Sequence, residues 1–265
     1  MDSATAARLI ELNREFYTHF GGSFSATRQR IQPGVRRVLD LLHGDEKILD
    51  LGCGNGELAR ELARRGQRGS YLGVDFSLPL LREAESPPAE ASQPGNVAAA
   101  TWHNFSATFH AMDLTKLTLE TTSFIPSPLS FDIVFSFATL HHIPSRDFRI
   151  NLLKTIHQLL QPGGLFIHSN WQFLNSEKLK ARIQPWKDVA VSGPELSGVE
   201  VSGVDAGDYL LDWRSGGKGL RYVHHFNEEE LRDLAEATGF QVIDTFYSDG
   251  QTGNLGLYQV WKPSS

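Results

Sequence analysis

ILDLGCGNGELAREL, residues 48–62, is the stretch of sequence that decides the fold of this chain. It begins with a mostly apolar run of the kind that forms a strand buried on both faces, and it ends with leucines at helical spacing. Gly52, Gly54 and Gly56 stand where the pattern changes. Glycine reaches positive φ angles and has no Cβ to hold a ligand away from the backbone. The stretch therefore predicts a strand, a ligand-binding glycine loop and a helix.

The spacing of these glycines departs from the dinucleotide-binding pattern of parallel α/β proteins. That pattern is G-x-G-x-x-G, whereas here the third glycine comes one residue early and Glu57 follows it. The departure favours a different adenosine ligand over NAD. An ordinary glycine turn is the alternative interpretation of the loop on its own.

The loop resembles motif I of class I S-adenosylmethionine-dependent methyltransferases, a family with a doubly wound, mostly parallel sheet of seven strands in a Rossmann-like α/β fold. The resemblance implies that Asp50 and the glycine loop face the methionine half of the cofactor, S-adenosylmethionine. It also implies that an acid after the next strand, residues 70–74, binds the ribose hydroxyls, and a carboxylate can accept both of them. The cofactor residues expected from these two strand ends are Asp50, Gly52, Cys53, Gly54, Gly56, Asp75 and Phe76.

Two later strand ends complete the expected cofactor site. Residues 105–113 alternate as a third strand, and by resemblance Asp113 contacts the adenine amino group; a plain turn aspartate is the alternative. Residues 131–137 form the fourth strand, and ligands of open parallel sheets bind outside the carboxyl ends of strands where the strand order reverses. The resemblance thus adds Met112, Asp113, Leu114, Ser136 and Phe137 to the cofactor site.

The length of 265 residues is enough to bury a full core, and we expect a single methyltransferase domain over residues 1–265. Residues 172–220 lack clear periodicity, and long segments of this kind in compact domains are usually functional covers. The expected parts are an N-terminal helical lid (1–44), a cofactor-binding core (45–171), a substrate cap inserted after the fifth strand (172–226), and a C-terminal helix with two closing strands (227–265).

Composition and charge limit the partners. The net charge of −6 argues against non-specific affinity for nucleic acid, because phosphate neutralisation supplies most of that affinity. Arginines nevertheless gather in residues 24–39 and 60–68, which indicates either a local basic face or ordinary solvated helix faces. No apolar run approaches the length of a membrane span, and the N-terminus lacks a signal-peptide core. We therefore expect a cytoplasmic protein with no membrane partner.

Cysteine and histidine spacing predicts no metal site. The only cysteine, Cys53, lies in the glycine loop, where a small packing residue is a better interpretation than a nucleophile. The histidine pairs at 141–142 and 224–225 are adjacent in sequence and cannot easily turn two rings to one ion.

The methyl acceptor decides which catalytic groups are needed. A sulfonium methyl is already activated, so transfer mainly needs an acceptor held in line. An amine or hydroxyl needs a base, for which His141 after the fourth strand is the candidate, whereas a carboxylate needs only a cation and a dry site.

A closer resemblance narrows the acceptor. FSATR at residues 24–28, LHH at 140–142 and RYVHHF at 221–226 are similar to signatures of the tRNA methyltransferases that esterify 5-carboxymethyluridine at the wobble position, including the methyltransferase domain of a eukaryotic AlkB homologue. This resemblance implies tRNA as substrate, a carboxylate as acceptor, and a small activator protein as a further partner. The acceptor-site residues that it implies are Arg28, His141, Arg221 and His224. For Arg28, pinning the lid to the core is the alternative.

Two other functions stay open at this point. The acidic chain and its unusual cap are also compatible with a small-molecule O- or N-methyltransferase that uses a histidine base. A non-catalytic methyltransferase-like subunit is the third alternative, although such a subunit could lose the glycines or Asp75, which this chain keeps. The sequence does not determine the oligomeric state.

Overall fold

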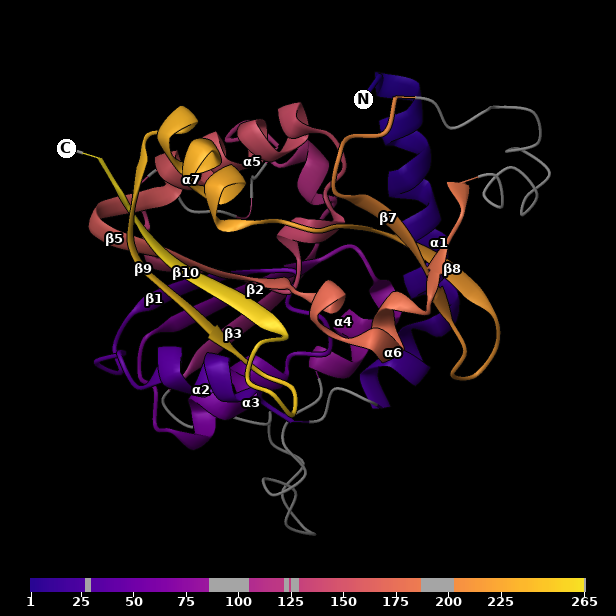
Figure 1. Ribbon diagram of the computed structural model, residues 1–265. Helices are drawn as coiled ribbons and strands as arrows, with labels where there is room; N and C mark the ends of the chain where they lie inside the picture. The colour runs from indigo at the N-terminus through magenta and orange to yellow at the C-terminus, as the bar shows by residue number, and fades with distance from the viewer. Residues whose placement is uncertain (27–29, 86–104, 122–123, 125–128, 187–202, 265) are drawn as a thin grey trace, which may run out of the picture.

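The computed structural model describes residues 1–26, 30–85, 105–121, 124, 129–186 and 203–264. Its centre is a seven-stranded sheet with the order β3-β2-β1-β4-β5-β10-β9 (Figure 1). Strands β1 to β5 of this sheet are parallel, and β10 pairs antiparallel with both β5 and β9. The predicted doubly wound sheet is therefore confirmed. Its strands are β1 (Lys47–Leu51), β2 (Ser70–Asp75), β3 (Ser106–Ala111), β4 (Phe131–Phe137), β5 (Leu160–Trp171), β9 (Phe240–Ser248) and β10 (Gly256–Pro263).

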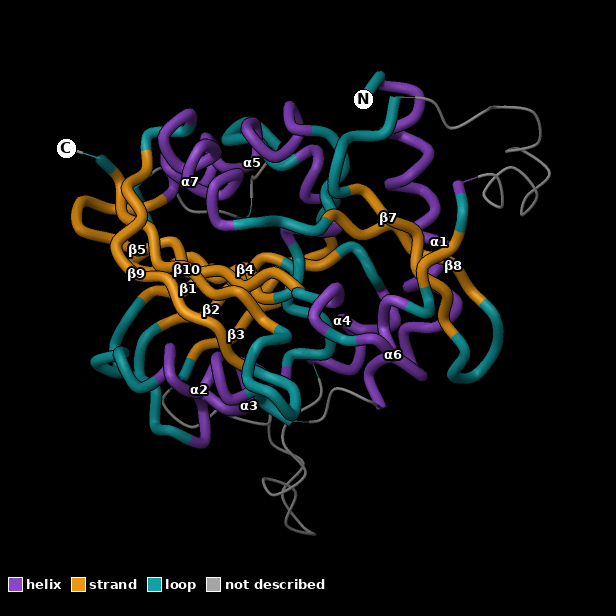
Figure 2. Tube along the Cα trace, in the orientation of Figure 1, coloured by secondary structure: helices purple, strands orange, loops and turns teal. Residues whose placement is uncertain are grey.

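Helices cover both faces of this sheet, as Figure 2 shows. One face packs against α5 (Arg146–Leu159) and α7 (Glu228–Ala237), and the other packs against α2 (Pro33–Leu39) and α3 (Glu57–Arg64). Four of the five residues of β1 are buried, as its apolar run predicted. Ser145 caps α5 and Asn227 caps α7, and the side-chain oxygen of each accepts a hydrogen bond from a backbone N–H group of its helix.

The first helix, α1 (Ser3–Ala26), continues through Gly21 and Gly22, although glycine is a poor helix former. A Cβ built on Gly21 would lie 3.6 Å from side-chain atoms of Ser77 and Leu80, so this turn packs closely against α4 (Leu78–Ala84). Tertiary packing therefore outweighs the low helix propensity of glycine here.

A second, three-stranded antiparallel sheet forms the part of the cap that the structure describes. Its order is β6-β7-β8, from β6 (Ile183–Gln184), β7 (Asp208–Trp213) and β8 (Gly219–His224), with α6 (Glu177–Lys180) beside it. Figure 1 shows α1 running alongside β7 and β8. Although residues 172–220 lack clear periodicity in the sequence, residues 208–213 and 219–224 form strands, and 214–218 connect them. The strands were missed because they bury Leu210 and Tyr222 against a helix from the far end of the chain.

The arginines after the glycine loop do not form a free basic face. Those of α3 and its C-terminus are paired with acids of the same region, which agrees with the alternative of an ordinary solvated helix. The pairs are Arg60–Glu57, Arg64–Glu57, Arg64–Glu61, Arg65–Asp40 and Arg65–Glu61. Within the described residues, no helix is long and apolar enough to cross a membrane.

Candidate active site

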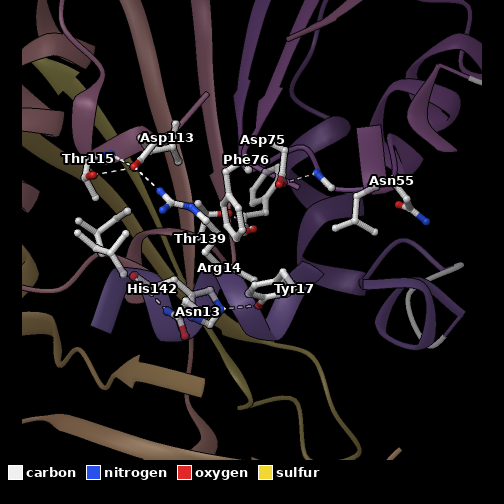
Figure 3. Close-up of a pocket in the computed structure, with 18 of the residues that line it drawn as sticks. Asn13, Arg14, Tyr17, Asn55, Asp75, Phe76, Asp113, Thr115, Thr139 and His142 are labelled. Carbon is white, nitrogen blue, oxygen red and sulfur yellow. Dashed lines mark hydrogen bonds and ion pairs between the residues drawn. The ribbon is translucent and has the colours of Figure 1, made fainter. Parts of the chain in front are cut away.

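Two cavities meet at the carboxyl ends of β1 and β4, where the strand order reverses. The first has a volume of about 210 Å³ and lies between α1, the glycine loop and the ends of β2 and β3 (Figure 3). The second has a volume of about 440 Å³ and lies between the glycine loop, the end of β5, β8 and the turn from β9 to β10. Four residues line both cavities: Gly52, Phe137, Ala138 and His142.

The glycine loop has the strand-to-helix geometry that the sequence predicts. Gly52, Gly54 and Gly56 all have positive φ angles, of +79°, +54° and +77°. A Cβ on Gly52 would lie 2.2 Å from Oγ1 of Thr139, so no larger residue fits between the loop and the segment after β4. A Cβ on Gly54, by contrast, would have no neighbour within 4 Å, so the backbone at Gly54 is an open part of the wall of the first cavity.

Asp75 lies in the wall of the first cavity, next to Phe76. Its carboxylate accepts hydrogen bonds from the backbone N–H groups of Gly54 (3.0 Å) and Ser77 (2.8 Å). Burial raises the pKa of Asp75, and these N–H groups oppose that rise. A carboxylate offers about four acceptor positions, so further positions are available for a diol at the cavity wall.

Asp113 faces the same cavity from the end of β3. Its Oδ2 accepts a 2.9 Å hydrogen bond from Arg14 of α1, and its Oδ1 accepts bonds from the backbone N–H and the hydroxyl of Thr115 (Figure 3). Asp113 thus acts as a turn aspartate and also faces the cavity, together with Leu114. Met112 and Ser136, which were also expected to bind the cofactor, do not line either cavity. Met112 packs against the core, and Ser136 is 1% exposed on the face of the sheet under α5.

Asp50 lies under the glycine loop and, with Cys53, lines the second cavity. Burial raises the pKa of Asp50 to about 7, against the lowering effect of a hydrogen bond from Tyr71 and with a further rise from the nearby charge of Asp75. A buried carboxylate of this kind suits a cationic partner such as an amine. Burial also raises the pKa of the Cys53 thiol well above its usual value, which agrees with a packing role.

Arg221 and His141 meet in the second cavity. Arg221 is 4% exposed, and its guanidinium lies 4.9 Å from the ring centre of Trp171, 5.5 Å from Phe16 and 5.7 Å from Trp213. Nδ1 of His141 accepts a 3.3 Å hydrogen bond from the backbone N–H of Trp171, so in the neutral ring the proton is on Nε2. This side of the site therefore presents a fixed cation and an N–H donor.

His224 lies outside both cavities, unlike the other two described residues that the closer resemblance assigned to the acceptor site. Its Nδ1 is 2.6 Å from Asp208 and its Nε2 is 2.9 Å from Glu230. Arg149 of α5 joins the same buried group through contacts to both acids. His224 thus ties the cap sheet to α5 and α7. His224 stands three residues after Arg221 on β8, and strand residues an odd number of positions apart point to opposite faces.

Arg28 lies outside the described residues. The described residues on either side of 27–29 reach the site: Ser25 lines the first cavity and Arg30 lines the second. Among the described residues, no group of three potential metal ligands lies close enough to hold an ion.

Several lining residues of α1 were missed by the sequence analysis. Asn13, Arg14 and Tyr17 line the first cavity, and His142 lines both. The sequence contained a signal for two of them. Asn13 and Tyr17 are polar residues on the same buried face of the helix as the apolar Leu9 and Phe16. Buried polar residues on an apolar stripe need partners, and here those partners belong to the site.

Comparison with known proteins identifies the family. A family model described as a methyltransferase domain matches residues 24–245. A methyltransferase of Encephalitozoon cuniculi is 28% identical over 230 residues, which cover 86% of this chain and 87% of that protein. A ubiquinone biosynthesis O-methyltransferase of Pseudomonas aeruginosa is 29% identical over 119 residues, 45% of this chain and 41% of that protein.

Solved structures share the fold. An S-adenosylmethionine-dependent methyltransferase from Methanosarcina mazei superposes with a TM-score of 0.59 at 23% identity, over 88% of this chain and 98% of that one. The 1,6-didemethyltoxoflavin-N1-methyltransferase of Burkholderia thailandensis was solved with S-adenosylhomocysteine bound. It superposes with a TM-score of 0.59 at 20% sequence identity, over 99% of this chain and 90% of that one.

The residues of this chain fit the cofactor that these relatives use. The open backbone at Gly54, the buried Asp75 at the end of β2 and the buried Asp50 supply the space and the acceptors that an adenosyl group and an amine require. The chain belongs to the methyltransferase-domain family, and it is an S-adenosylmethionine-dependent methyltransferase.

Proposed function

We propose that this methyltransferase forms a methyl ester on a carboxylate, and that the carboxylate is the 5-carboxymethyl group of a wobble uridine in tRNA. The observation that supports the carboxylate is the buried guanidinium of Arg221 in the wall of the cavity that adjoins the cofactor cavity. An arginine binds a carboxylate through two parallel N–H bonds, and such charge-assisted bonds are stronger where water is excluded.

When bound, the cofactor would supply an activated methyl group, and a carboxylate acceptor would carry no proton for a base to remove. The groups of this chain then have only to bind and orient the acceptor. Arg221 neutralises the carboxylate, and the Nε2 proton of His141 supplies a second donor. Val35, Leu58 and Tyr258 contribute apolar surface that keeps the cavity dry.

The tautomer of His141 favours this acceptor over a hydroxyl or an amine. A general base needs a free lone pair toward the substrate, but Nδ1 of His141 is directed at the N–H of Trp171. Its other nitrogen is then a donor in the neutral ring, which suits an anion.

The ubiquinone biosynthesis relative motivates a second candidate, an O-methyltransferase that deprotonates a small-molecule hydroxyl. His142 supports this candidate, because its Nδ1 bonds to the carbonyl of Tyr222 and its Nε2 is therefore the basic nitrogen. Tyr17 already donates to that nitrogen at 2.9 Å, so a hydroxyl acceptor would have to displace it. For this reason we prefer the carboxylate.

The tRNA part of the proposal depends on the closer resemblance at residues 24–28, 140–142 and 221–226. Because the proposed substrate is tRNA, we also propose that the protein acts in the cytoplasm. The same resemblance leads us to propose a small activator protein as its partner. The test is incubation of the protein with labelled cofactor and separate pools of tRNA and small metabolites, with and without added cell extract. Label in tRNA that mild alkali releases as methanol supports the proposal, whereas alkali-stable label or label in the metabolite pool alone contradicts it.

A further inference from the structure

Asn13 lies in the middle of α1, is 4% exposed, and lines the first cavity. Asparagine is a poor helix former because its side chain competes for backbone hydrogen bonds. Here the side chain makes its hydrogen bonds outside the helix, with the backbone of Tyr222 and of His142. Figure 3 shows Asn13 beside His142. Asn13 therefore connects α1 to two other segments of the site.

The carboxamide of Asn13 binds the backbone of Tyr222 on β8 twice. Its Oδ1 accepts from the N–H of Tyr222 at 2.8 Å, and its Nδ2 donates to the carbonyl of the same residue at 3.1 Å. A backbone N–H can only donate and a carbonyl can only accept, so these two bonds fix the orientation of the carboxamide. Within the described residues, β8 is an edge strand of the cap sheet. Asn13 thus gives Tyr222 the partners that a neighbouring strand would supply.

The same backbone position is connected to the second cavity. Arg221 directly precedes Tyr222, and its side chain lines that cavity. The carbonyl of Tyr222 also accepts a 3.0 Å hydrogen bond from Nδ1 of His142, which lines both cavities. A fixed backbone at Tyr222 restricts where the neighbouring Arg221 side chain can lie.

We propose that Asn13 is a positioning residue through which a bound cofactor fixes β8 and the Arg221 side chain that β8 carries. Because α1 forms one wall of the first cavity, a cofactor in that cavity contacts α1 and stabilises its docked position. A docked α1 in turn holds β8 through the two bonds of Asn13. A ligand that favours one arrangement shifts the population toward that arrangement.

The apolar contacts between α1 and the cap do not replace these bonds. Leu9 and Leu12 of α1 pack with Leu210 and Tyr222, but apolar contacts are non-directional. Coupling between two binding sites is reciprocal, so a ligand held by Arg221 should also strengthen cofactor binding. The inference requires the cofactor that this family uses, and it does not depend on the identity of the acceptor.

The test is hydrogen–deuterium exchange of β8, residues 219–224, in the wild-type protein with and without saturating S-adenosylhomocysteine. We expect the ligand to slow exchange of the Tyr222 amide and its neighbours by about tenfold, the size of one or two net hydrogen bonds. Exchange in β9 serves as the internal reference. No acceptor is required, so failure of this inference is distinct from failure of the proposed function.

Three variants check the role of Asn13, each at a ligand concentration that calorimetry shows to be saturating. Asn13→Leu removes both bonds at similar volume and should reduce the effect of the ligand on β8 to less than about twofold. Asn13→Asp has the same shape but places an oxygen against the carbonyl of Tyr222, so it should also lose most of the effect. Asn175→Leu is the matched control, because exposed Asn175 likewise donates to a backbone carbonyl, that of Asn254 at 2.8 Å. It should respond to the ligand as the wild type does.

Two outcomes would overturn the proposal. The first is wild-type β8 whose exchange does not change when S-adenosylhomocysteine binds, a result that needs no variant to fold. The second is Asn13→Leu with the wild-type ratio of exchange rates with and without ligand. In that case Asn13 only stabilises the fold, because a purely structural residue changes both rates equally.

Discussion

The hydroxyl of Tyr71 donates a 2.6 Å hydrogen bond to Oδ2 of Asp50, beneath the glycine loop. Both residues are almost fully buried, and they come from neighbouring strands, β2 and β1. The bond holds the Asp50 carboxyl at the wall of the second cavity, where burial raises its pKa to about 7. Asp50 is therefore poised to change its charge near neutral pH when a cation arrives.

The first prediction concerns the pH dependence of cofactor binding. A cationic amine binds the ionised form of Asp50, so below pH 7 the carboxyl must release a proton when the cofactor binds. The affinity for the cofactor should be constant above pH 7. Below pH 7 it should decrease with falling pH, by up to about tenfold per pH unit. Calorimetry in two buffers of different ionisation enthalpy measures the released proton. Asp50→Asn should bind weakly with no pH dependence, and an unchanged pH profile in that variant would remove Asp50 from the site.

The second prediction concerns the stability of the free protein. The folded-state pKa of Asp50 lies above the value of 3.8 that applies to an unperturbed aspartate, so the unfolded chain ionises first as the pH rises. The wild type should therefore lose stability relative to Asp50→Asn between about pH 4 and pH 7, by on the order of 4 kcal/mol. Chemical unfolding of both proteins at pH 4 and pH 8 measures this change. A stability difference between variant and wild type that is the same at both pH values would contradict the prediction.

The third prediction compares two glycines of the same loop. Both Gly52 and Gly54 have positive φ angles, which should cost alanine about 1–2 kcal/mol at either position. A Cβ on Gly52 also overlaps Thr139, whereas a Cβ on Gly54 has no neighbour within 4 Å. Gly52→Ala should therefore lose more stability and much more cofactor affinity than Gly54→Ala. Equal effects in thermal unfolding and calorimetry would show that backbone strain alone is responsible.

The fourth prediction concerns His224, which the structure places between Asp208 and Glu230 and outside the cavities. Removal of one partner of a buried hydrogen-bonded group typically costs about 1–3 kcal/mol, because the remaining polar atoms lose their partner. His224→Gln should lower the free energy of unfolding strongly and leave cofactor affinity unchanged below the unfolding temperature. His43→Gln, where the side chain is 89% exposed, is the control. A stable His224→Gln protein with lost activity would return His224 to the acceptor site.

The sequence predicted the secondary structure around the glycine loop and around the two strand-end acids, because this structure is local in the chain. The glycine loop joins β1 to α3 within a few residues, and Asp75 and Asp113 each end the strand that carries them. Hydrophobic period and glycine spacing report such short-range structure directly.

The contacts of α1 with the rest of the site were less predictable because segments distant in sequence make them. Asn13 and Tyr222 are 209 residues apart in sequence and share two hydrogen bonds, and Tyr17 and His142 are 125 residues apart. No local period encodes such contacts. The cap strands were missed for the same reason, since β7 and β8 bury their apolar residues against α1.

The most direct test of the proposed carboxylate acceptor uses a synthetic anticodon stem-loop with 5-carboxymethyluridine at the wobble position, and a second one with the neutral carboxamide there. Mass spectrometry after incubation with the cofactor, together with any activator that cell extract shows to be needed, measures transfer to each. We predict one alkali-labile methyl group on the carboxylate, none on the carboxamide, and a large loss of transfer in Arg221→Lys, because lysine cannot form two parallel bonds. Equal transfer to both stem-loops, or an alkali-stable methyl group, would contradict the account.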